Sequence, residues 1–374
     1  MKARVEKVFR HLDPRPDVLL LANATDPHLD QTFFYLFDVP AGLFEGSVAI
    51  AHPDGELDVL SSPLESESAY QAAKHDPHVK VHVVGRGDET EGLVKKLVGS
   101  AADIGLHYRE LTHDWFVRLS KMLPSVTWSD ASNAVRRARV TKDAEEIVRL
   151  RRAAEIGSAV GREIPPLLQE GVTELGLAAE MEYRMSRHGA SGRSFATIVA
   201  FGAHGAEPHY SPGETRLASG DSIVCDFGAY YRRYASDITR SFHFGRRDEE
   251  LKKIHDTVEA AQAAALSVIR PGVPGKEVHL AAQRVIDASP WKGRLNHGVG
   301  HSIGLSVHDG WGYNTTVDDP LEEGMAITVE PGIYLPGRGG VRIEDDVVVT
   351  KTGYEFLSTA PRAYLEVPAW SSAS

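Results

Sequence analysis

Acidic residues directly follow apolar, β-branched runs at several places in the second half of the sequence. Asp226 follows Ile223-Val224-Cys225, and Glu330 and Glu344 each end a similar run. Runs of this kind are typical of buried strands. A buried carboxylate costs several kcal/mol unless a partner neutralises it. The fold must therefore bring these acids to a shared cation, and a divalent metal ion would provide one.

A fourth acid, Asp237, lies eleven residues beyond Asp226, across a polar segment that contains Tyr230 to Tyr234. If the flanking strands pair as a hairpin, both carboxylates reach one site. Acids at strand ends are common, so this pair alone predicts little. Together with Glu330 and Glu344, it predicts one metal site with two pairs of carboxylates.

Three histidines lie in a glycine-rich stretch that runs from Asn296 to Asp309. They are His297, His301 and His308, and the glycines between them permit tight turns and close approach to a ligand. A lone histidine is more often a core residue. Three of them, in a domain with four unexplained acids, indicate a functional site.

The first 138 residues are predicted to form a small α/β domain. Short β-rich runs alternate with helix-like stretches such as Thr90 to Val98, and Asp54-Gly55 between two of the runs predicts a hairpin. A chain of 374 residues exceeds what one hydrophobic core usually organises. We therefore expect a second domain over residues 139–374.

The second domain is predicted to open with a long helix over residues 142–165, with Thr141 as its N-cap. A weak repeat follows, because Leu177-Ala178-Ala179 after this helix is echoed by Leu280-Ala281-Ala282 after a second long helix. Strands follow the helices in each half and supply a pair of acids. The basic stretch from Arg136 to Arg152 is interleaved with acids and is typical of a solvated helix face.

Composition excludes several classes of function. The formal net charge of −11 argues against a nucleic-acid partner, which needs a clustered basic surface. Cys225 is the only cysteine, which excludes an intramolecular disulfide and a cysteine-based zinc site. The apolar run from Val18 to Ala22 is too short for a signal peptide core or a membrane span. We expect a cytoplasmic protein without a membrane partner.

The chain resembles the pita-bread metallopeptidases, the family of methionine aminopeptidase, aminopeptidase P and prolidase. The resemblance covers roughly residues 140–360 and is carried by five motifs: Asp226, Asp237, His301, Glu330-Pro331-Gly332 and Arg342-Ile343-Glu344-Asp345. It implies an α+β pita-bread catalytic domain. The first domain is similar to the creatinase-like α/β domain that prolidase and aminopeptidase P carry and methionine aminopeptidase lacks.

The resemblance implies a site for two divalent metal ions. Asp226 would bind one ion, His301 and Glu330 the other, and Asp237 and Glu344 would bridge them. A hydroxide between the metals would be the nucleophile, because bound metals lower the pKa of water from about 16 to between 7 and 9. One imidazole and four carboxylates suit manganese first, with cobalt or zinc as alternatives.

The resemblance also assigns roles at the substrate. His209, in Glu207-Pro208-His209-Tyr210, and His308 match residues that contact the substrate and the tetrahedral intermediate, and His297 matches a further pocket histidine. Glu330 would carry a proton to the leaving amine. Arg342 is expected to bind substrate and to hold Glu344 or Asp237 by charge-assisted hydrogen bonds.

The implied reaction is hydrolysis of Xaa-Pro bonds by a homodimeric, prolidase-like dipeptidase. The alternative is an aminopeptidase P that acts on longer peptides, because Gly310 to Glu323 contains no Lys or Arg to receive a proline carboxylate. Arg338 or a partner subunit would have to substitute. A remote alternative is a metal-free creatinase-like hydrolase or a non-catalytic binding protein, but those relatives typically lose metal ligands.

Overall fold

The computed structural model describes residues 1–85, 87–246 and 248–368. The chain divides into two compact units, Met1–Arg139 and Val140–Ser374, called here the N-terminal and C-terminal units. In the described part of the chain, no helix combines the length and the apolar content needed to cross a bilayer.

The N-terminal unit is an α/β fold built on one mixed sheet with the strand order β4-β3-β2-β1-β5-β6. Strand β2 is antiparallel to both of its neighbours, whereas the other pairs are parallel. The turn at Asp54-Gly55 joins β2 to β3 as predicted, and Gly55 has φ +92°. The elements are α1 (Lys2–Arg10), β1 (Val18–Ala22), α2 (Gln31–Phe37), β2 (Val48–Ala51), β3 (Leu57–Ser61), α3 (Ser66–Ala73), β4 (Val79–Val83), α4 (Gly87–Val98), β5 (Asp103–Leu106), α5 (His113–Met122), β6 (Thr127–Asp130) and α6 (Ser132–Val140).

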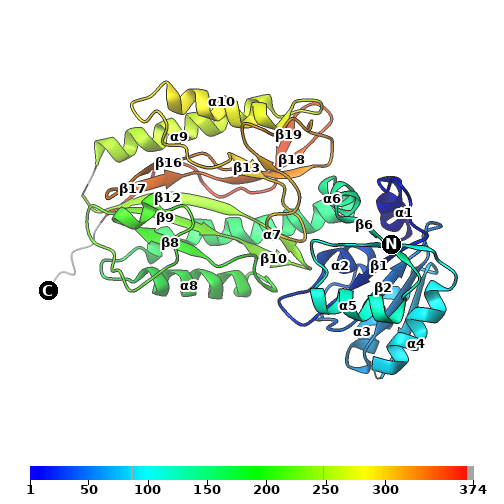
Figure 1. Ribbon diagram of the computed structural model, residues 1–374. Helices are drawn as coiled ribbons and strands as arrows, with labels where there is room; N and C mark the ends of the chain where they lie inside the picture. The colour runs from blue at the N-terminus through cyan, green and yellow to red at the C-terminus, as the bar shows by residue number, and fades with distance from the viewer. Residues whose placement is uncertain (86, 247, 369–374) are drawn as a thin grey trace. The chain divides into compact units, whose positions relative to one another are not determined.

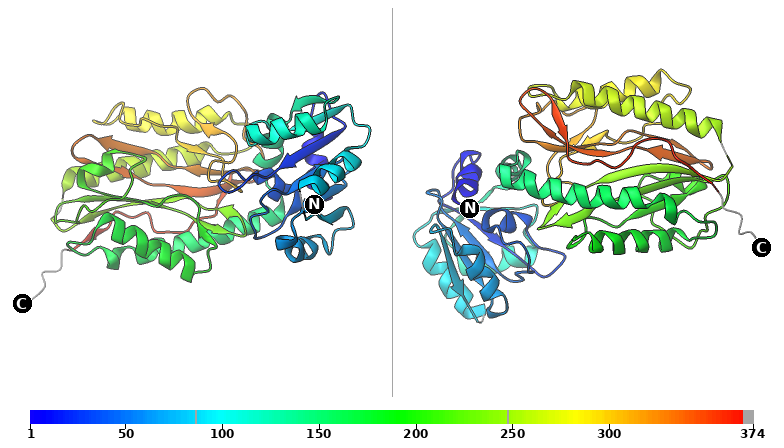
Figure 2. Two further views of the ribbon diagram at one scale, coloured as in Figure 1. Left: turned by 60° about the horizontal axis from the view of Figure 1, so that its bottom comes forward. Right: turned by 180° about the vertical axis from the view of Figure 1, so that it is seen from behind.

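The C-terminal unit is α+β, with strands that lie between two pairs of helices, α7 with α8 and α9 with α10 (Figure 1, Figure 2). The helices are α7 (Ala144–Glu163), α8 (Glu174–Arg187), α9 (Glu249–Val268) and α10 (Gly275–Asp287). The strands are β7 (Gly192–Arg193), β8 (Ile198–Phe201), β9 (Ser222–Phe227), β10 (Ala229–Tyr231), β11 (Tyr234–Ala235), β12 (Ile238–Phe244), β13 (Gly300–His301), β14 (Gly312–Tyr313), β15 (Ala326–Val329), β16 (Gly332–Leu335), β17 (Gly339–Arg342), β18 (Asp345–Val349), β19 (Tyr354–Phe356) and β20 (Glu366–Val367).

The weak repeat in the sequence corresponds to this layered arrangement. One apolar core cluster joins helices α7 and α8 to the first strands, through residues such as Val160, Met181 and Cys225. A second cluster joins α9 and α10 to the later strands, through residues such as Val258 and Ile327. Each half therefore buries its own helix pair against its own strands. The predicted fold class, α/β followed by α+β, is confirmed.

The predicted start of the first long helix was wrong by two residues. Asp143, not Thr141, is the N-cap of α7, and its side chain accepts from the backbone N–H of Glu146 at 2.8 Å. The Glu146 side chain in turn accepts from the N–H of Asp143 at 2.9 Å. This capping box satisfies two N–H groups at once, while Thr141 forms an isolated β-bridge with Met325.

The basic stretch was also misread as one solvated helix face. It spans the end of α6 and the start of α7, and Arg139, Lys142 and Arg149 are buried. Arg149 forms an ion pair with Glu145, Lys142 donates to the carbonyl oxygen of Val140, and Arg139 donates to the Thr32 hydroxyl. The aliphatic stems of such residues can pack in a core while the charged end keeps a partner.

The turn between Asp226 and Asp237 packs so closely that one of its positions has no room for a side chain. A Cβ added at Gly228 would lie 1.8 Å from the carbonyl oxygen of Ser236 and 2.2 Å from the Ser194 hydroxyl. Gly228 therefore lets the two arms of the β9–β12 hairpin approach closely. Both acids of this hairpin depend on that approach for their positions.

Gly228→Ala is expected to lower the free energy of unfolding by about 1–3 kcal/mol, because the added methyl group forces the backbone apart. The measurement is the urea midpoint of the manganese-loaded protein. Gly192→Ala is the matched control, since nothing lies within 4 Å of a Cβ at that position. Equal midpoints for both variants would contradict the packing argument.

Candidate metal centre

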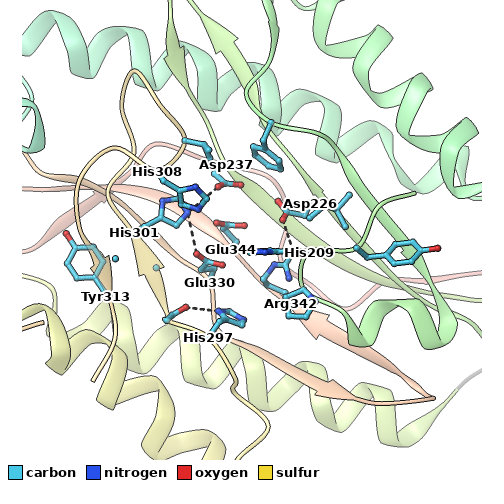
Figure 3. Close-up of a pocket in the computed structure, with 18 of the residues that line it drawn as sticks. His209, Asp226, Asp237, His297, His301, His308, Tyr313, Glu330, Arg342 and Glu344 are labelled. Atoms are coloured by element: carbon cyan, nitrogen blue, oxygen red, sulfur yellow. Dashed lines mark hydrogen bonds and ion pairs between the residues drawn. The ribbon is translucent and has the colours of Figure 1, made fainter. Parts of the chain in front are cut away.

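A cavity of about 540 Å³ opens in the C-terminal unit. Every site residue expected from the sequence lines it: His209, Asp226, Asp237, His297, His301, His308, Glu330, Arg342 and Glu344. Figure 3 shows the acids and His301 turned toward one another in the middle of this cavity. The structure thus brings all nine residues together in one place.

The first pair of acids comes from the β9–β12 hairpin. Strands β9 and β12 are antiparallel with Asp226 opposite Thr239, and Asp237 directly precedes β12. The backbone N–H of Asp237 donates to Asp346 at 2.9 Å, which fixes the start of the strand. In the described residues, the Oδ1 atoms of Asp226 and Asp237 are buried and have no hydrogen-bond partner. Such unpaired carboxylate oxygens fit a cation.

The second pair of acids comes from the later strands. Glu330 directly follows β15, and Glu344 lies between β17 and β18. The Glu344 carboxylate is 1% exposed and accepts a hydrogen bond from Thr239 Oγ1 at 2.6 Å. The Glu330 carboxylate accepts from Thr328 Oγ1 at 3.3 Å. Thr239 thereby ties an acid of the second half to a strand of the first.

His301 completes the group. Its Nε2 lies 3.5 Å from both Asp237 Oδ2 and Glu330 Oε1. Its Nδ1 lies 3.2 Å from the carbonyl oxygen of Ser302, so this nitrogen carries the proton and donates. The unprotonated Nε2 then faces the acids, which is the orientation that a metal-binding histidine needs. The Nε2 of His301 and oxygens of Asp237 and Glu344 also lie close enough together to share one ion.

The backbone of His301 approaches the neighbouring strand through Gly300. A Cβ at Gly300 would lie 2.1 Å from the carbonyl oxygen of Thr328. The Thr328 hydroxyl also accepts from the N–H of His301 at 3.0 Å. The glycine before His301 therefore sets the distance between this imidazole and Glu330, two residues beyond Thr328.

Burial and mutual repulsion dominate the electrostatics of the site. Burial, and then the charges of Glu344 and Asp226, raise the pKa of Asp237 well above its usual value. Burial, and then Glu330 and Asp226, do the same to the pKa of Glu344. Burial lowers the pKa of His301, which keeps its imidazole neutral. Without cations these acids therefore resist ionisation, and divalent ions relieve the cost.

Arg342 does not contact the acids expected from the sequence. Its NH2 donates to Asp226 Oδ2 at 2.6 Å, instead of to Glu344 or Asp237. Its Nε donates to Thr239 Oγ1 at 2.9 Å, because β17 turns the guanidinium toward β9 and β12. The arginine is 3% exposed. These contacts orient Asp226, and the expected contact of Arg342 with substrate stays a prediction.

His297 is held by a tyrosine that the sequence did not single out. The Nδ1 of His297 lies 2.7 Å from the carbonyl oxygen of Gly298 and must donate to it. Burial lowers the pKa of this histidine, so its Nε2 is an acceptor, and it lies 2.8 Å from the Tyr334 hydroxyl. Tyr334 donates to His297 and accepts from Arg342 NH1 at 2.9 Å. Both ring nitrogens of His297 are therefore occupied, and its contact with a substrate would use the ring carbons.

The sequence indicated that the hydroxyl of Tyr334 needs a partner, but it did not identify that partner. A tyrosine in a buried strand needs a partner for its hydroxyl, and Tyr334 is 3% exposed in β16. The sequence does not say which partner the hydroxyl finds, because His297 and Arg342 reach it only through the tertiary fold.

His209 and His308 also line the cavity. The ring of His308 packs 4.3 Å from that of His301, between ring centroids. Removal of its ring from solvent, and then His301 and His209, lower the pKa of His308 to about 4. At pH 7 it is a neutral imidazole that can donate one hydrogen bond. His209 is exposed on the segment after the short helix Gly202–Ala206.

The rest of the cavity wall is largely apolar and aromatic, with Phe195, Ala196, Ile198, Val307 and Tyr313 among its members. In the part of the chain that the structure describes, Arg342 is the only lysine or arginine in this wall. This arginine is already bonded to Asp226.

Residues 148–351 match the model of metallopeptidase family M24. An uncharacterized peptidase of Bacillus subtilis is 36% identical over 259 residues, 69% of this chain and 73% of its own length. An uncharacterized peptidase of Staphylococcus aureus strain USA300 is 38% identical over 232 residues, 62% of this chain and 66% of its own.

Solved structures cover nearly the whole chain. The X-Pro aminopeptidase of Thermotoga maritima has a TM-score of 0.87 at 30% identity, covering 98% of this chain and 99% of its own. The Xaa-Pro dipeptidase of Bacillus anthracis has a TM-score of 0.87 at 31% identity, covering 97% and 99%. The prolidase of Pyrococcus horikoshii has a TM-score of 0.85 at 30% identity, covering 96% and 99%.

Glu344→Gln tests the repulsion between the acids. In metal-free protein this variant should unfold at a higher temperature than the parent, by about 2–4 °C for each kcal/mol of repulsion that it removes. Manganese should then raise the melting temperature of the parent more than that of the variant. The measurement is thermal unfolding with chelator and with manganese.

The matched control is Glu323→Gln, at an exposed glutamate of the same unit. It should leave both melting temperatures unchanged. A metal-free Glu344→Gln protein that melts below the parent would show that Glu344 stabilises the fold without a cation.

Proposed function

Because the chain belongs to metallopeptidase family M24, we propose that it hydrolyses the peptide bond between a first residue and a proline in second position. The observation that carries the proposal is the meeting of five ligand-type side chains on one cavity floor, where two carboxylate oxygens lack partners among the described residues. The apolar wall beside this floor supports the proline preference, and so do the names of the similar X-Pro aminopeptidase and Xaa-Pro dipeptidase.

The donor set fits two divalent cations. Four carboxylates bring four negative charges, which two such ions balance. Asp226 would hold one ion and His301 and Glu330 the other, with Asp237 and Glu344 shared between them. Such ions supply charge neutralisation and a water acidic enough to ionise near neutral pH. The oxygen-rich set favours manganese, with cobalt and zinc as alternatives.

The chain's own groups act on the substrate. The neutral imidazole of His308 would donate a hydrogen bond to the carbonyl oxygen of the scissile bond as negative charge develops there. Glu330, whose Oε1 lies 3.5 Å from His301 Nε2, would pass a proton to the proline nitrogen that leaves. His209 would contact the peptide from the rim. Proline suits this site because its nitrogen has no hydrogen to donate.

The length of the substrate is the open choice within this proposal. A dipeptide such as Ala-Pro, the substrate first expected, ends in a carboxylate that needs a cation. Arg338, which was considered for this role, pairs instead with Asp248 and Glu250 at 2.9 and 2.8 Å, outside the cavity. Since Arg342 is engaged with Asp226, the wall favours longer peptides as a second candidate. A neighbouring subunit of a homodimer would be another source of the cation.

The substrate prediction is that manganese-loaded protein cleaves Ala-Pro or Ala-Pro-Ala faster than Ala-Ala, and that a chelator abolishes the activity. The measurement is the rate of bond cleavage under identical conditions, counted as one free alanine for each Ala-Pro or Ala-Pro-Ala cleaved and two for each Ala-Ala. Preference for Ala-Pro-Ala would support an aminopeptidase and preference for Ala-Pro a dipeptidase. Faster cleavage of Ala-Ala would overturn the proline preference, and full activity without metal would overturn the mechanism.

His308→Ala should lower kcat by about a hundredfold or more, because it removes a donor to the developing oxyanion. Its manganese content should equal that of the parent, since His308 is not assigned to either ion. Steady-state kinetics and metal analysis of the purified protein provide the test. His113→Ala, at an exposed histidine of the N-terminal unit, is the control. Loss of manganese from the His308 variant would make this residue a ligand.

A further inference from the structure

Glu174, the first residue of α8, is a buried acid that the proposed mechanism does not use. It is 0% exposed, and its carboxylate accepts four hydrogen bonds. Its Oε1 accepts from the N–H of Phe201 at 2.9 Å and from His204 Nδ1 at 2.8 Å. Its Oε2 accepts from the Tyr210 hydroxyl at 2.9 Å and from the N–H of Gly213 at 3.1 Å. All lone pairs that a carboxylate directs toward donors are thus used.

The four donors all belong to one segment, residues 201–213, which carries His209. The bonds hold this segment at its beginning, at its end and at two points between. The same segment contributes Pro208, His209, Tyr210 and Ser211 to the cavity wall. Its own structure is one short helix, Gly202–Ala206, and His209 itself is exposed. The position of His209 therefore depends on the anchors of the segment.

The position of Glu174 is itself fixed by its place at the start of α8. Glu174 begins α8 behind the N-cap Thr173, whose hydroxyl accepts from the N–H of Gly176 at 3.0 Å. A carboxylate at this end of a helix is favoured by the helix dipole. Within the segment, the ring of His204 stacks on that of Tyr210 at 4.5 Å between centroids. Two of the side chains that Glu174 holds therefore also support one another.

We propose that Glu174 is a positioning residue that holds residues 201–213 so that His209 and Tyr210 meet the peptide at the rim of the cavity. This inference rests on the proposed function, in which His209 contacts substrate. It implies that a weaker anchor impairs peptide binding and leaves the metal ions in place, because the five assigned ligands lie on other segments.

The test uses His204→Ala in the full-length, manganese-loaded protein. The His204 side chain is 38% exposed and does not line the cavity, so its removal cuts one bond to Glu174 and the stacking on Tyr210 while leaving every cavity-lining side chain in place. His188→Ala is the matched control: it removes a histidine that is 37% exposed and bonded to Glu163 at 2.8 Å, near the other end of α8.

Hydrogen exchange of residues 201–213 and the steady-state constants are measured together. His204→Ala should lose exchange protection in this segment and raise KM about three- to tenfold, the effect of one hydrogen bond to a charged group. Its kcat should change less than twofold, and the melting-temperature increase on adding manganese should be unchanged. Glu174→Gln should raise KM at least as much, since its one amide oxygen keeps only one of the two pairs of donors. When Glu174→Gln and His204→Ala are combined, the fold-increase in KM should be smaller than the product of the two single effects.

Unchanged KM despite lost protection would overturn the inference, and so would a parallel loss of kcat and manganese binding. The kinetics use whichever of Ala-Pro, Ala-Pro-Ala and Ala-Ala the parent cleaves, so failure of the proline preference leaves this test intact. If the parent cleaves none of them, the proposed function fails. The exchange measurement then decides the anchoring alone, and unchanged protection overturns it.

Discussion

Four carboxylates converge on one buried floor, and their mutual repulsion is the constraint that the rest of the C-terminal unit must satisfy. Burial and like charge raise the pKa of Asp237, Glu344 and Glu330 together. A fold would not hold such a group by packing alone, because uncompensated buried charge is expensive. The strand pairs, the close approaches at Gly228 and Gly300 and the hydroxyl of Thr239 hold these acids together, and Asp237 and Glu344 lie close enough to share one ion with His301.

Arg240 holds together the strands that carry these acids. Its guanidinium donates to the carbonyl oxygens of Thr239 and Glu344 and to the Asp345 carboxylate, so one side chain joins the first hairpin to the later strands. Burial alone would raise the pKa of Asp345, but Arg240 and Arg362 hold it below the usual value. The paired charges of Arg240 and Asp345 thus adjoin the acids of the proposed metal site.

The sequence predicted the fold class and the family, because both follow from local patterns. Acids at the ends of β-branched runs pointed to Asp226, Glu330 and Glu344, and glycine spacing pointed to His301. The partners of these residues could not be predicted. Thr239 reaches Glu344, and Arg342 reaches Asp226, only after strands far apart in sequence have paired in one register. The same limit hid the four donors of Glu174.

The division of the C-terminal unit into two halves has a consequence for how the protein folds. The first half supplies Asp226 and Asp237, and the second supplies His301, Glu330 and Glu344, so neither half alone contains the whole donor set. The complete donor set therefore forms only when the two halves have docked and have brought together residues far apart in the sequence. Bound ions then stabilise the native state and not the docking that precedes it. The ions are therefore expected mainly to lower the rate of unfolding, with little effect on the rate of folding.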